Sequence, residues 1–557
     1  MAADQEQAVD SSGIVKGMPM FAPGDPEVLA KEQAELRSLE SKGVLARYKW
    51  YLSKSGPGWM QSAMTLGGGS AFASLFAGAF LGYKLLWVQP LAMLMGVIML
   101  SALAHQTLSV RERPFYAMKK HFSPTMAWLW AFSAILATVI WHFPQYALAA
   151  GMSADVINAI VSPTAAVGEG FTDTHNTTAW MLGLGVLFLI FGTVVSWNYG
   201  SGRKGIKTFE RIVKILIWFV IVCFAIVVTC VAVKGRIPWG ELFSGFLPYN
   251  FADGTWNIPF GDARGIDIMI AALSAAVGIN MTFLFGYSYL ARGWGKEHRG
   301  LAKFDLVTGM LIPYILATSL MVVATACTIY DSKAIAEFQP KMETYKELKA
   351  SGATEESAQE LSGLTNDQLT DYEKILKSGR LPPMKAASMF TAAGIPPVIS
   401  RLIFGLGIIG MVMNCITLHM LVSGFAACEI FGVEAGGWKY KLACLTPVPG
   451  FFGVIIWTKI GSWIAIPTSA VCLIMLPIAY IGFFALNNSK SYLGDEMPRG
   501  VKRFVWNTAM LVTIGIILVS AAFYIYKSGP VYYRKIMELF NKDTAETAMI
   551  MVKQFFV

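Results

Sequence analysis

The sequence predicts an all-α integral membrane protein with eleven membrane-spanning helices, and three observations support this prediction. Of the 557 residues, 55% are hydrophobic and only 15% are charged, and the mean hydropathy of +0.51 is too high for a soluble chain of this length. Apolar runs long enough to cross the hydrocarbon core of a bilayer recur along the chain. The Lys and Arg residues gather in alternate connections between these runs.

The distribution of positive charge predicts how the spans are oriented. The predicted spans are residues 57–83, 85–109, 125–150, 178–198, 208–233, 267–291, 304–330, 396–430, 442–458, 462–486 and 504–526. Lys and Arg follow every second span, whereas residues 151–177, after the third, contain none. Because Lys- and Arg-rich loops stay in the cytoplasm, we expect the amino terminus inside the cell, the carboxy terminus outside it, and the protein in the plasma membrane. The net charge of +9 then reflects orientation in the lipid bilayer and does not indicate nucleic-acid binding.

The spans divide the chain into six predicted regions. These are a cytoplasmic amino-terminal arm (1–54), a first repeat of five spans (55–233), an external loop (234–266), a second repeat of five spans (267–486) with an external helical insert (331–390), a cytoplasmic loop with the eleventh span (487–526), and an external tail (527–557). The arm reads as an amphipathic helix at KEQAELRSLESKG, and the insert has a helix-like stretch, LTNDQLTDYEKILKSG. There is no P-loop, GxSxG, HExxH or pair of carboxylates within a span, so we expect neither an enzyme nor a bound cofactor.

Two spans carry sequences that disfavour a continuous helix. The first contains TLGGGSAF (Thr65–Phe72), in which each glycine costs about 1 kcal/mol of helix propensity relative to alanine. The sixth contains AAVGINMTFLFGY (Ala275–Tyr287), five spans later. Inverted repeats of five spans, each with its first helix broken at mid-membrane, indicate a secondary transporter whose solute lies between the breaks. The alternative is that the glycines only let helices pack closely, which we consider weaker for three adjacent glycines.

Several segments resemble one known family. GPGWMQSAMTLGGGSAFASLFAGAFLGYKLLWV (Gly56–Val88) resembles the first span of the Nramp family of proton-coupled divalent-metal transporters. Residues Gly205–Lys214, Ile403–Gly432 and Thr468–Ile481 are similar to its fifth, eighth and tenth spans. The resemblance implies a LeuT-like fold with the substrate held between spans 1 and 6.

The chain departs from this family where the family binds metal. The family's Asp-Pro-Gly-Asn motif in span 1 aligns with Gly67, Gly68, Gly69 and Ser70, and its Met-Pro-His motif in span 6 aligns with Met281, Thr282 and Phe283. The Gln of its tenth span aligns with Ser469, and the acidic residues of its third span align with Val139 and His142. The side-chain oxygen ligands are therefore lost, and only the sulfur of Met281 remains as a weak candidate metal ligand. No Asp or Glu lies in the middle of a predicted span to replace them.

The predicted substrate site consists of residues at the two breaks and one in the tenth span: Gly67, Gly68, Gly69, Ser70, Gly278, Asn280, Met281, Thr282 and Ser469. Without a carboxylate, this site favours a divalent cation that keeps its water, so we expect hydrated Mg²⁺ rather than Mn²⁺ or Fe²⁺. Free amides at a helix start would instead suit an amino acid or another organic solute. A solute sensor that does not transport is a further alternative. His142 is the candidate proton relay, because histidine titrates near neutral pH; the alternative is a histidine bonded to another helix, which is also what we expect for His419.

Overall fold

The apolar runs fold as helices, because inside a bilayer every backbone N–H and C=O group must find its hydrogen-bond partner within the protein. The computed structural model describes residues 26–540 except 40–41, 166–168, 199–202, 252–253, 261, 331–340, 342–343, 346, 349–350, 364–382, 393 and 434–436. Within these residues, ten segments are long and apolar enough to span a membrane, and the bent pair α3 (Pro57–Thr65) and α4 (Gly68–Leu81) supplies an eleventh. The predicted number of spans is confirmed.

The elements before the second break follow the predicted spans closely. They are α1 (Pro26–Ser38), α2 (Val44–Lys54), α3, α4, α5 (Val88–Val110), α6 (Pro114–His121), α7 (Pro124–Val161), α8 (Phe171–Thr174), α9 (Thr177–Asn198), α10 (Arg203–Val233), α11 (Trp239–Gly245), the paired strands β1 (Tyr249–Asn250) and β2 (Thr255–Trp256), and α12 (Ala263–Ala276). The helix predicted in the arm at residues 31–43 is confirmed in part, because α1 covers Pro26–Ser38. One span is longer than predicted, since α7 continues from 150 to Val161.

The elements after the second break include several short or irregular helices. They are α13 (Ile279–Ala291), η1 (Lys296–His298), α14 (Arg299–Leu306), η2 (Val307–Leu311), α15 (Ile312–Thr328), α17 (Glu355–Ser362), α19 (Pro383–Ala392), α20 (Pro397–Phe431), α21 (Trp438–Cys444), η4 (Val448–Phe452), α22 (Gly453–Ile460), η5 (Gly461–Ile464), α23 (Ala465–Leu473), α24 (Leu476–Asn487), α25 (Lys490–Leu493), η6 (Gly494–Glu496) and α26 (Gly500–Phe540). The helix-like stretch predicted at 364–379 lies outside the described residues.

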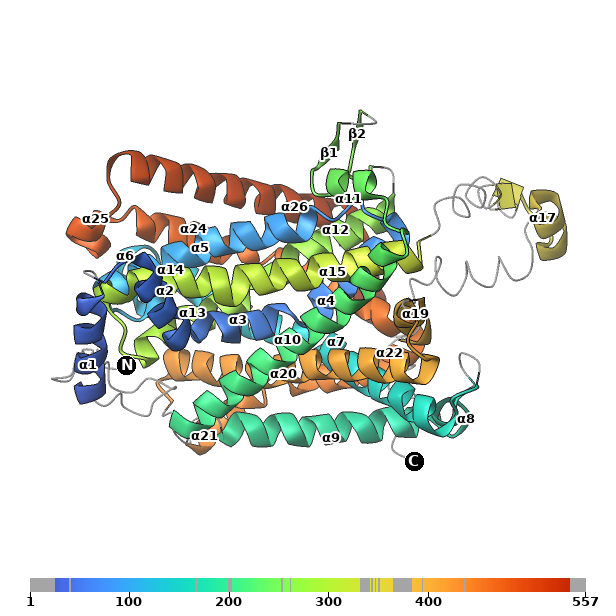
Figure 1. The fold of residues 1–557 in the computed structure, drawn as a ribbon, viewed down its shortest axis with the longest axis horizontal. Coiled ribbons are helices and arrows are strands. Elements are labelled where there is room, and N and C mark those ends of the chain that lie inside the picture. Colours follow the sequence, from blue (N-terminus) through green and yellow to red (C-terminus); the bar gives the residue numbers. More distant parts are fainter. Residues whose placement is uncertain are drawn as a thin grey trace.

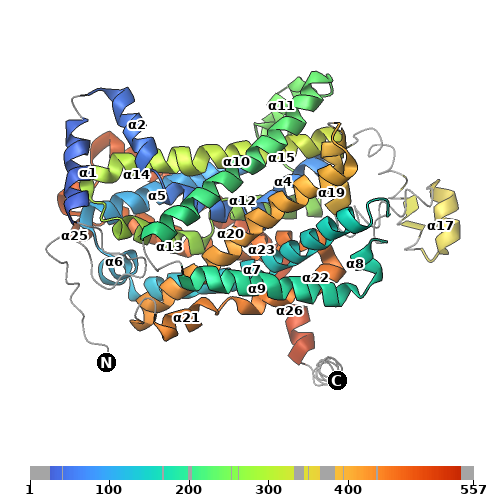
Figure 2. The same cartoon turned by 60° about the horizontal axis from the view of Figure 1, so that its bottom comes forward.

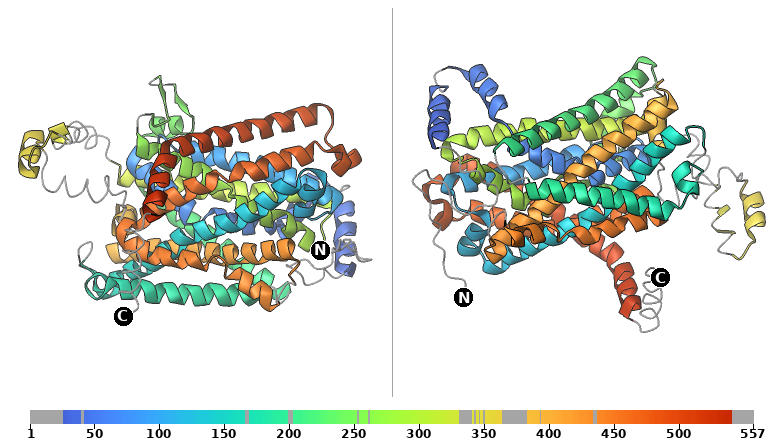
Figure 3. Two further views of the ribbon diagram at one scale, coloured as in Figure 1. Left: turned by 180° about the vertical axis from the view of Figure 1, so that it is seen from behind. Right: turned by 90° about the horizontal axis from the view of Figure 1, so that it is seen from below.

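The long helices lie side by side in one bundle, and its two ends carry different elements (Figure 1). The helices α1 and α2 lie at one end, which we call the arm end; α17 lies beyond the opposite end, which we call the insert end. Figure 2 shows α11 projecting from the bundle near the insert end. The last helix, α26, runs along the outside of the bundle from the arm end, and its final part turns away from it (Figure 3). This helix contains Pro530, a residue that bends helices.

The two broken helices lie in the centre, packed against α7 and α20. Helix α4 contacts α12, α15 and α23, and α7 and α20 contact each other over most of their length. Polar pairs tie α7 to α20 in an antiparallel register: the Thr138 and Ser423 hydroxyls are 2.9 Å apart, and Arg401 bonds the Asp155 carboxylate at 2.6 Å. Two helices broken at the same level, within two sets of five spans and followed by an eleventh span, make this the predicted LeuT-like fold.

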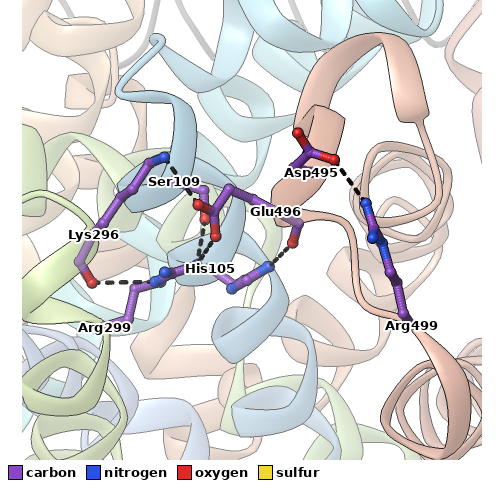
Figure 4. A network of polar contacts seen from close by, with 7 residues as sticks. All are labelled: His105, Ser109, Lys296, Arg299, Asp495, Glu496 and Arg499. Atoms are coloured by element: carbon purple, nitrogen blue, oxygen red, sulfur yellow. Dashed lines mark hydrogen bonds and ion pairs between the residues drawn. The ribbon is translucent and has the colours of Figure 1, made fainter.

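Charged side chains connect three elements at the arm end (Figure 4). The Glu496 carboxylate accepts hydrogen bonds from Lys296 Nζ at 2.9 Å and from Arg299 Nη1 at 2.7 Å. Its backbone carbonyl oxygen lies 3.0 Å from Nε2 of His105 on α5. These contacts hold the connection between α24 and α26 against α5 and α14. Lys296 and Arg299 also lower the pKa of Glu496 from 4.5 to about 2.

Candidate functional site

The first break is shorter than the glycine triplet suggests. Helix α3 ends at Thr65, and only Leu66 (φ −80°, ψ 55°) and Gly67 (φ −103°, ψ −172°) leave the helical conformation. The axes of α3 and α4 differ in direction by 54°. Gly68 and Gly69 are the first residues of α4, so only one of the three glycines is unwound.

The three glycines have a second role, which is close packing. A Cβ atom at Gly67 would lie 2.4 Å from Cys415 Sγ on α20, and one at Gly68 would lie 2.3 Å from the side chain of Leu148 on α7. At Gly69 it would lie 2.1 Å from the Trp141 ring. Such distances are far below van der Waals contact, so no side chain fits at these positions without displacing a neighbour. The packing interpretation and the cavity interpretation therefore both hold, because Gly67 and Gly69 also line a cavity.

The second break lies at Val277 and Gly278, whose backbone is extended between α12 and α13. The Gly278 N–H donates to Met281 Sδ at 3.4 Å, so the methionine sulfur folds back over the start of α13. The side-chain oxygen of Asn280 accepts from the Met281 N–H at 3.0 Å. This bond fixes the orientation of the amide, and Asn280 Nδ2 is left buried without a partner.

The two breaks meet at a small internal cavity. It has space for about one or two water molecules. Its lining residues come from both breaks, from α7 and from α20: Met64, Thr65, Gly67, Gly69, Ser70, Trp141, Gln145, Ala275, Gly278, Asn280, Met281 and His419. None of these lining residues is acidic. Six of the nine predicted site residues are therefore brought together, in agreement with a site between spans 1 and 6.

Three predicted residues do not line this cavity. The Gly68 N–H is occupied, because it donates to Gln145 Oε1 at 3.2 Å. The Thr282 hydroxyl donates to the Ile279 carbonyl at 2.6 Å and accepts from Trp130 Nε1 at 3.0 Å, so it faces α7 beside the site. Ser469 Oγ bonds the carbonyl of Ala465 one turn earlier in α23.

Two lining residues on α7 were not among the predicted site residues. Trp141 and Gln145 lie four residues apart, on one face of α7, and both line the cavity. Polar and indole side chains at this spacing around Pro144 were a usable signal, because polar groups inside a membrane helix seldom face lipid. The other unassigned lining residues are Met64, Thr65, Ala275 and His419.

Among the polar groups that line the cavity, acceptors at the first break have hydrogen-bond partners, whereas some donors have none. The carbonyls at the end of α3 already accept hydrogen bonds within the protein: Thr65 from the Ser70 hydroxyl, and Met64 from Cys415 Sγ at 3.4 Å. In contrast, the Nδ2 group of Asn280 has no acceptor, and Gln145 uses only its side-chain oxygen in the bond to Gly68. The walls therefore offer free donors and largely occupied acceptors at the first break.

A histidine pair lies beside the cavity. The Nδ1 atoms of His142 on α7 and His419 on α20 are 3.1 Å apart, so one ring donates to the other. The expectation that His419 bonds a neighbouring helix is confirmed, and His142 is the residue it bonds. His142 Nε2 is buried and has no hydrogen-bond partner. The proton-relay role of His142 stays a prediction.

Buried acidic residues lie elsewhere and have their own partners. Asp305 bonds the start of α3, Glu429 lies 3.2 Å from Arg113 and accepts from Tyr287, and Asp155 bonds Arg401. Across the part of the chain that the structure describes, no group of three or more His, Cys, Asp or Glu side chains is placed to hold a metal ion.

Comparisons with known proteins identify the family. The sequence matches the profile of the natural resistance-associated macrophage protein-like (Nramp) family over residues 58–353, more than half of the chain. Among curated proteins, no relative matches the sequence. The structure is similar to that of the Eremococcus coleocola manganese transporter in complex with an aromatic bis-isothiourea compound, with a TM-score of 0.60, 13% identity, and coverage of 92% of this chain and 93% of that one. A point variant of the same transporter gives a TM-score of 0.59 at 14% identity, covering 91% and 92% of the two chains. The profile match carries the conclusion that this chain belongs to the Nramp family.

Proposed function

We propose that this protein is a secondary transporter that moves a divalent cation by alternating access through the cavity between the two breaks. Membership of a family of divalent-metal transporters supports a metal ion as the substrate. The likeness to a manganese transporter is a likeness of fold at 13% identity, and it adds the arrangement of the helices rather than the choice of ion. We place the arm end in the cytoplasm and the protein in the plasma membrane.

The observation that supports Mg²⁺ over Mn²⁺ is the absence of an acidic side chain among the cavity's lining residues. Coulomb's law gives on the order of 4 kcal/mol for two unit charges 4 Å apart at an effective dielectric near 20, and about twice that for a dication. A dehydrated Mn²⁺ or Fe²⁺ loses this attraction and must still give up its water. Mg²⁺ keeps several waters when it binds, and these can contact backbone carbonyls and hydroxyls such as Ser70. Hydrated Mg²⁺ is therefore the proposed substrate.

The size of the cavity requires a second conformation. Six waters at roughly 30 Å³ each occupy about 180 Å³, whereas the cavity has space for about one or two. We therefore assign this structure to a contracted state, from which α3 or α13 must move before a hydrated ion can enter. Because α3 and α4 are separate helices joined at Leu66 and Gly67, α3 can swing without unfolding α4.

Flux into proteoliposomes tests the proposal. The experiment compares Mg²⁺, Mn²⁺, and a panel of amino and organic acids, with the purified full-length chain. We expect uptake of Mg²⁺ above Mn²⁺, and Asn280→Asp should shift the preference toward Mn²⁺ by adding a carboxylate to the cavity wall. Asn507→Asp is the matched control, because Asn507 lies on the outer helix α26 and bonds Asn488 at the end of α24, away from the cavity.

Two results would contradict the proposal. Uptake of an organic acid without uptake of either metal would identify a carrier of organic solutes. Binding of a ligand by calorimetry without any flux would identify a sensor. Gly68→Asp is unsuitable for adding charge, since its Cβ atom would lie 2.3 Å from the Leu148 side chain.

A further inference from the structure

We infer that the cavity between the breaks binds a small anion, which supplies the negative charge that its walls lack. Binding of the anion requires only the geometry of the cavity. Its passage together with a cation rests on the function proposed above. Three features of the cavity favour an anion: free hydrogen-bond donors in its wall, two helix dipoles directed at it, and its small volume.

Free side-chain donors line the cavity on two sides. Asn280 is 2% exposed, and its Nδ2 group has no partner, while its oxygen is held by the Met281 N–H. Gln145 is 1% exposed, and its oxygen is held by the Gly68 N–H, so its Nε2 group is the part left for a ligand. Trp141 adds an indole N–H, which can only donate. A buried donor without an acceptor costs free energy, so an acceptor in the cavity would be stabilised.

Two helix N-termini meet at the same place. Helix α4 begins at Gly68 and α13 begins at Ile279, directly after the two breaks, and residues of both first turns line the cavity. The first N–H groups of a helix lack partners within it, and they carry partial positive charge. Neither first turn contains an acidic residue to offset this charge. The Gly68 N–H is occupied by Gln145 and the Met281 N–H by Asn280, so the dipoles of the two helices and the free side-chain amide of Asn280, rather than these two backbone groups, favour a negative ligand.

Acceptors at the first break already take part in hydrogen bonds, whereas the donors named above do not. The Thr65 carbonyl accepts from the Ser70 hydroxyl and the Met64 carbonyl from Cys415 Sγ, so each of these acceptors already has one donor within the protein. The space for about one or two waters suits a halide or a single carboxylate head such as formate, and excludes a larger organic acid in this conformation. The geometry thus points to a chloride- or formate-sized anion that can share the widened site with a divalent cation.

An equilibrium titration tests anion binding. The purified protein is titrated with chloride or formate at constant ionic strength, with gluconate as the bulky balancing anion, and thermal unfolding is followed. We expect saturable stabilisation by chloride or formate. Asn280→Leu, which removes the free amide, should weaken binding roughly 10- to 100-fold, and Trp141→Phe, which removes the indole N–H and keeps a smaller aromatic ring, should weaken it about tenfold. Asn507→Leu is the control and should bind as wild type. Equal stabilisation by gluconate, or none by any anion, overturns the inference.

A flux experiment tests whether the anion accompanies the cation. Proteoliposome uptake of Mg²⁺ is measured in chloride, formate and gluconate. We expect uptake to fall at least tenfold in gluconate. Asn280→Asp supplies a fixed charge, so its uptake should not depend on the anion, whereas Asn507→Asp should retain the dependence.

The two proposals fail in different ways. Mg²⁺ uptake that is equal in all three salts, for wild type, overturns the shared passage and leaves the proposed function standing. Absence of metal uptake in every salt overturns the proposed function, and the titration then decides anion binding alone.

Discussion

The attachment of α3 to α14 provides the sharpest test of how the first break works. Asp305 is fully buried, and its carboxylate accepts hydrogen bonds from the Ser55 hydroxyl, from the Gly56 N–H at 3.0 Å and from the Gly58 N–H at 2.6 Å. The Asp305 carboxylate thereby supplies acceptors for N–H groups at the start of α3 that have no partner within the helix. We predict that Asp305→Ala releases the arm end of α3 from the bundle.

The size of the effect follows from the three bonds. A hydrogen bond to a charged group contributes about 1.5–3 kcal/mol, and bonds that share one acceptor are not additive, so we take roughly 3–5 kcal/mol for the set. Since 1.4 kcal/mol is a factor of ten, even about 3 kcal/mol raises the ratio of released to attached α3 roughly 100-fold. Asp305→Asn keeps one acceptor oxygen and should give a smaller increase.

Cys415 reports on this release, because it lies at the other end of α3. Its Sγ is buried against the carbonyls of Ala63 and Met64, at 3.6 and 3.4 Å. In a variant whose other six cysteines are replaced, we expect Asp305→Ala to raise the rate of Cys415 alkylation by the same factor of about 100. Ser55→Ala, which removes one bond, is the milder control.

An unchanged alkylation rate would refute this reasoning, provided that the variant keeps its elution volume and unfolding temperature. It would show that apolar packing of Trp59 and Met60 holds α3 in place without help from Asp305.

Three further predictions concern stability, measured by thermal unfolding in detergent. The lowered pKa of Glu496, about 2, means that its ion pairs contribute above about pH 4.5 and lose their effect as the pH falls towards 2. Glu496→Gln should therefore destabilise by less than about 1 kcal/mol at pH 7, with a smaller gap at pH 3. Arg401→Ala leaves the Asp155 carboxylate buried and unpaired, which should cost about 3–5 kcal/mol, and Asp155→Ala in the same chain should recover part of the loss. Gly69→Ala should cost about 1–3 kcal/mol by overpacking, whereas Gly183→Ala, with nothing within 4 Å, should be neutral or stabilising.

Much of the fold could be predicted because membrane spans leave a strong signal. Apolar length and loop charge specified eleven spans, and the spacing of the two irregular stretches specified the repeat. The end of α7 was missed by eleven residues, because the helix continues as Gly151–Val161 with polar side chains such as Asp155 and Asn158. Asp155 pairs with Arg401, 246 residues away, and Asn158 bonds Thr172 in the short helix α8 that follows, so the hydrophobic pattern of the helix alone does not reveal these partners.

The sequence predicted that the site lies at the two breaks, but not which side chains at the breaks face the cavity. The glycine triplet marked the first break correctly, yet only Gly67 is unwound, because Gly68 and Gly69 are placed in α4 by their fit against α7. Thr282 was expected in the site from its distance along α13, but its rotation about the helix axis directs it to Trp130. Such outcomes depend on helix rotation and tertiary packing, which a single sequence does not encode locally.

Gly67, Gly69 and Gly278 expose only backbone to the cavity, which limits how mutation can change the choice of solute. Glycine has no side chain to trim, so any mutation on those surfaces can only narrow the passage. Enlargement has to come from Met64, Trp141 or Met281, the bulky groups around it. Attempts to broaden the range of accepted solutes, by engineering or by natural drift, should therefore collect changes at these three positions and leave the glycines alone.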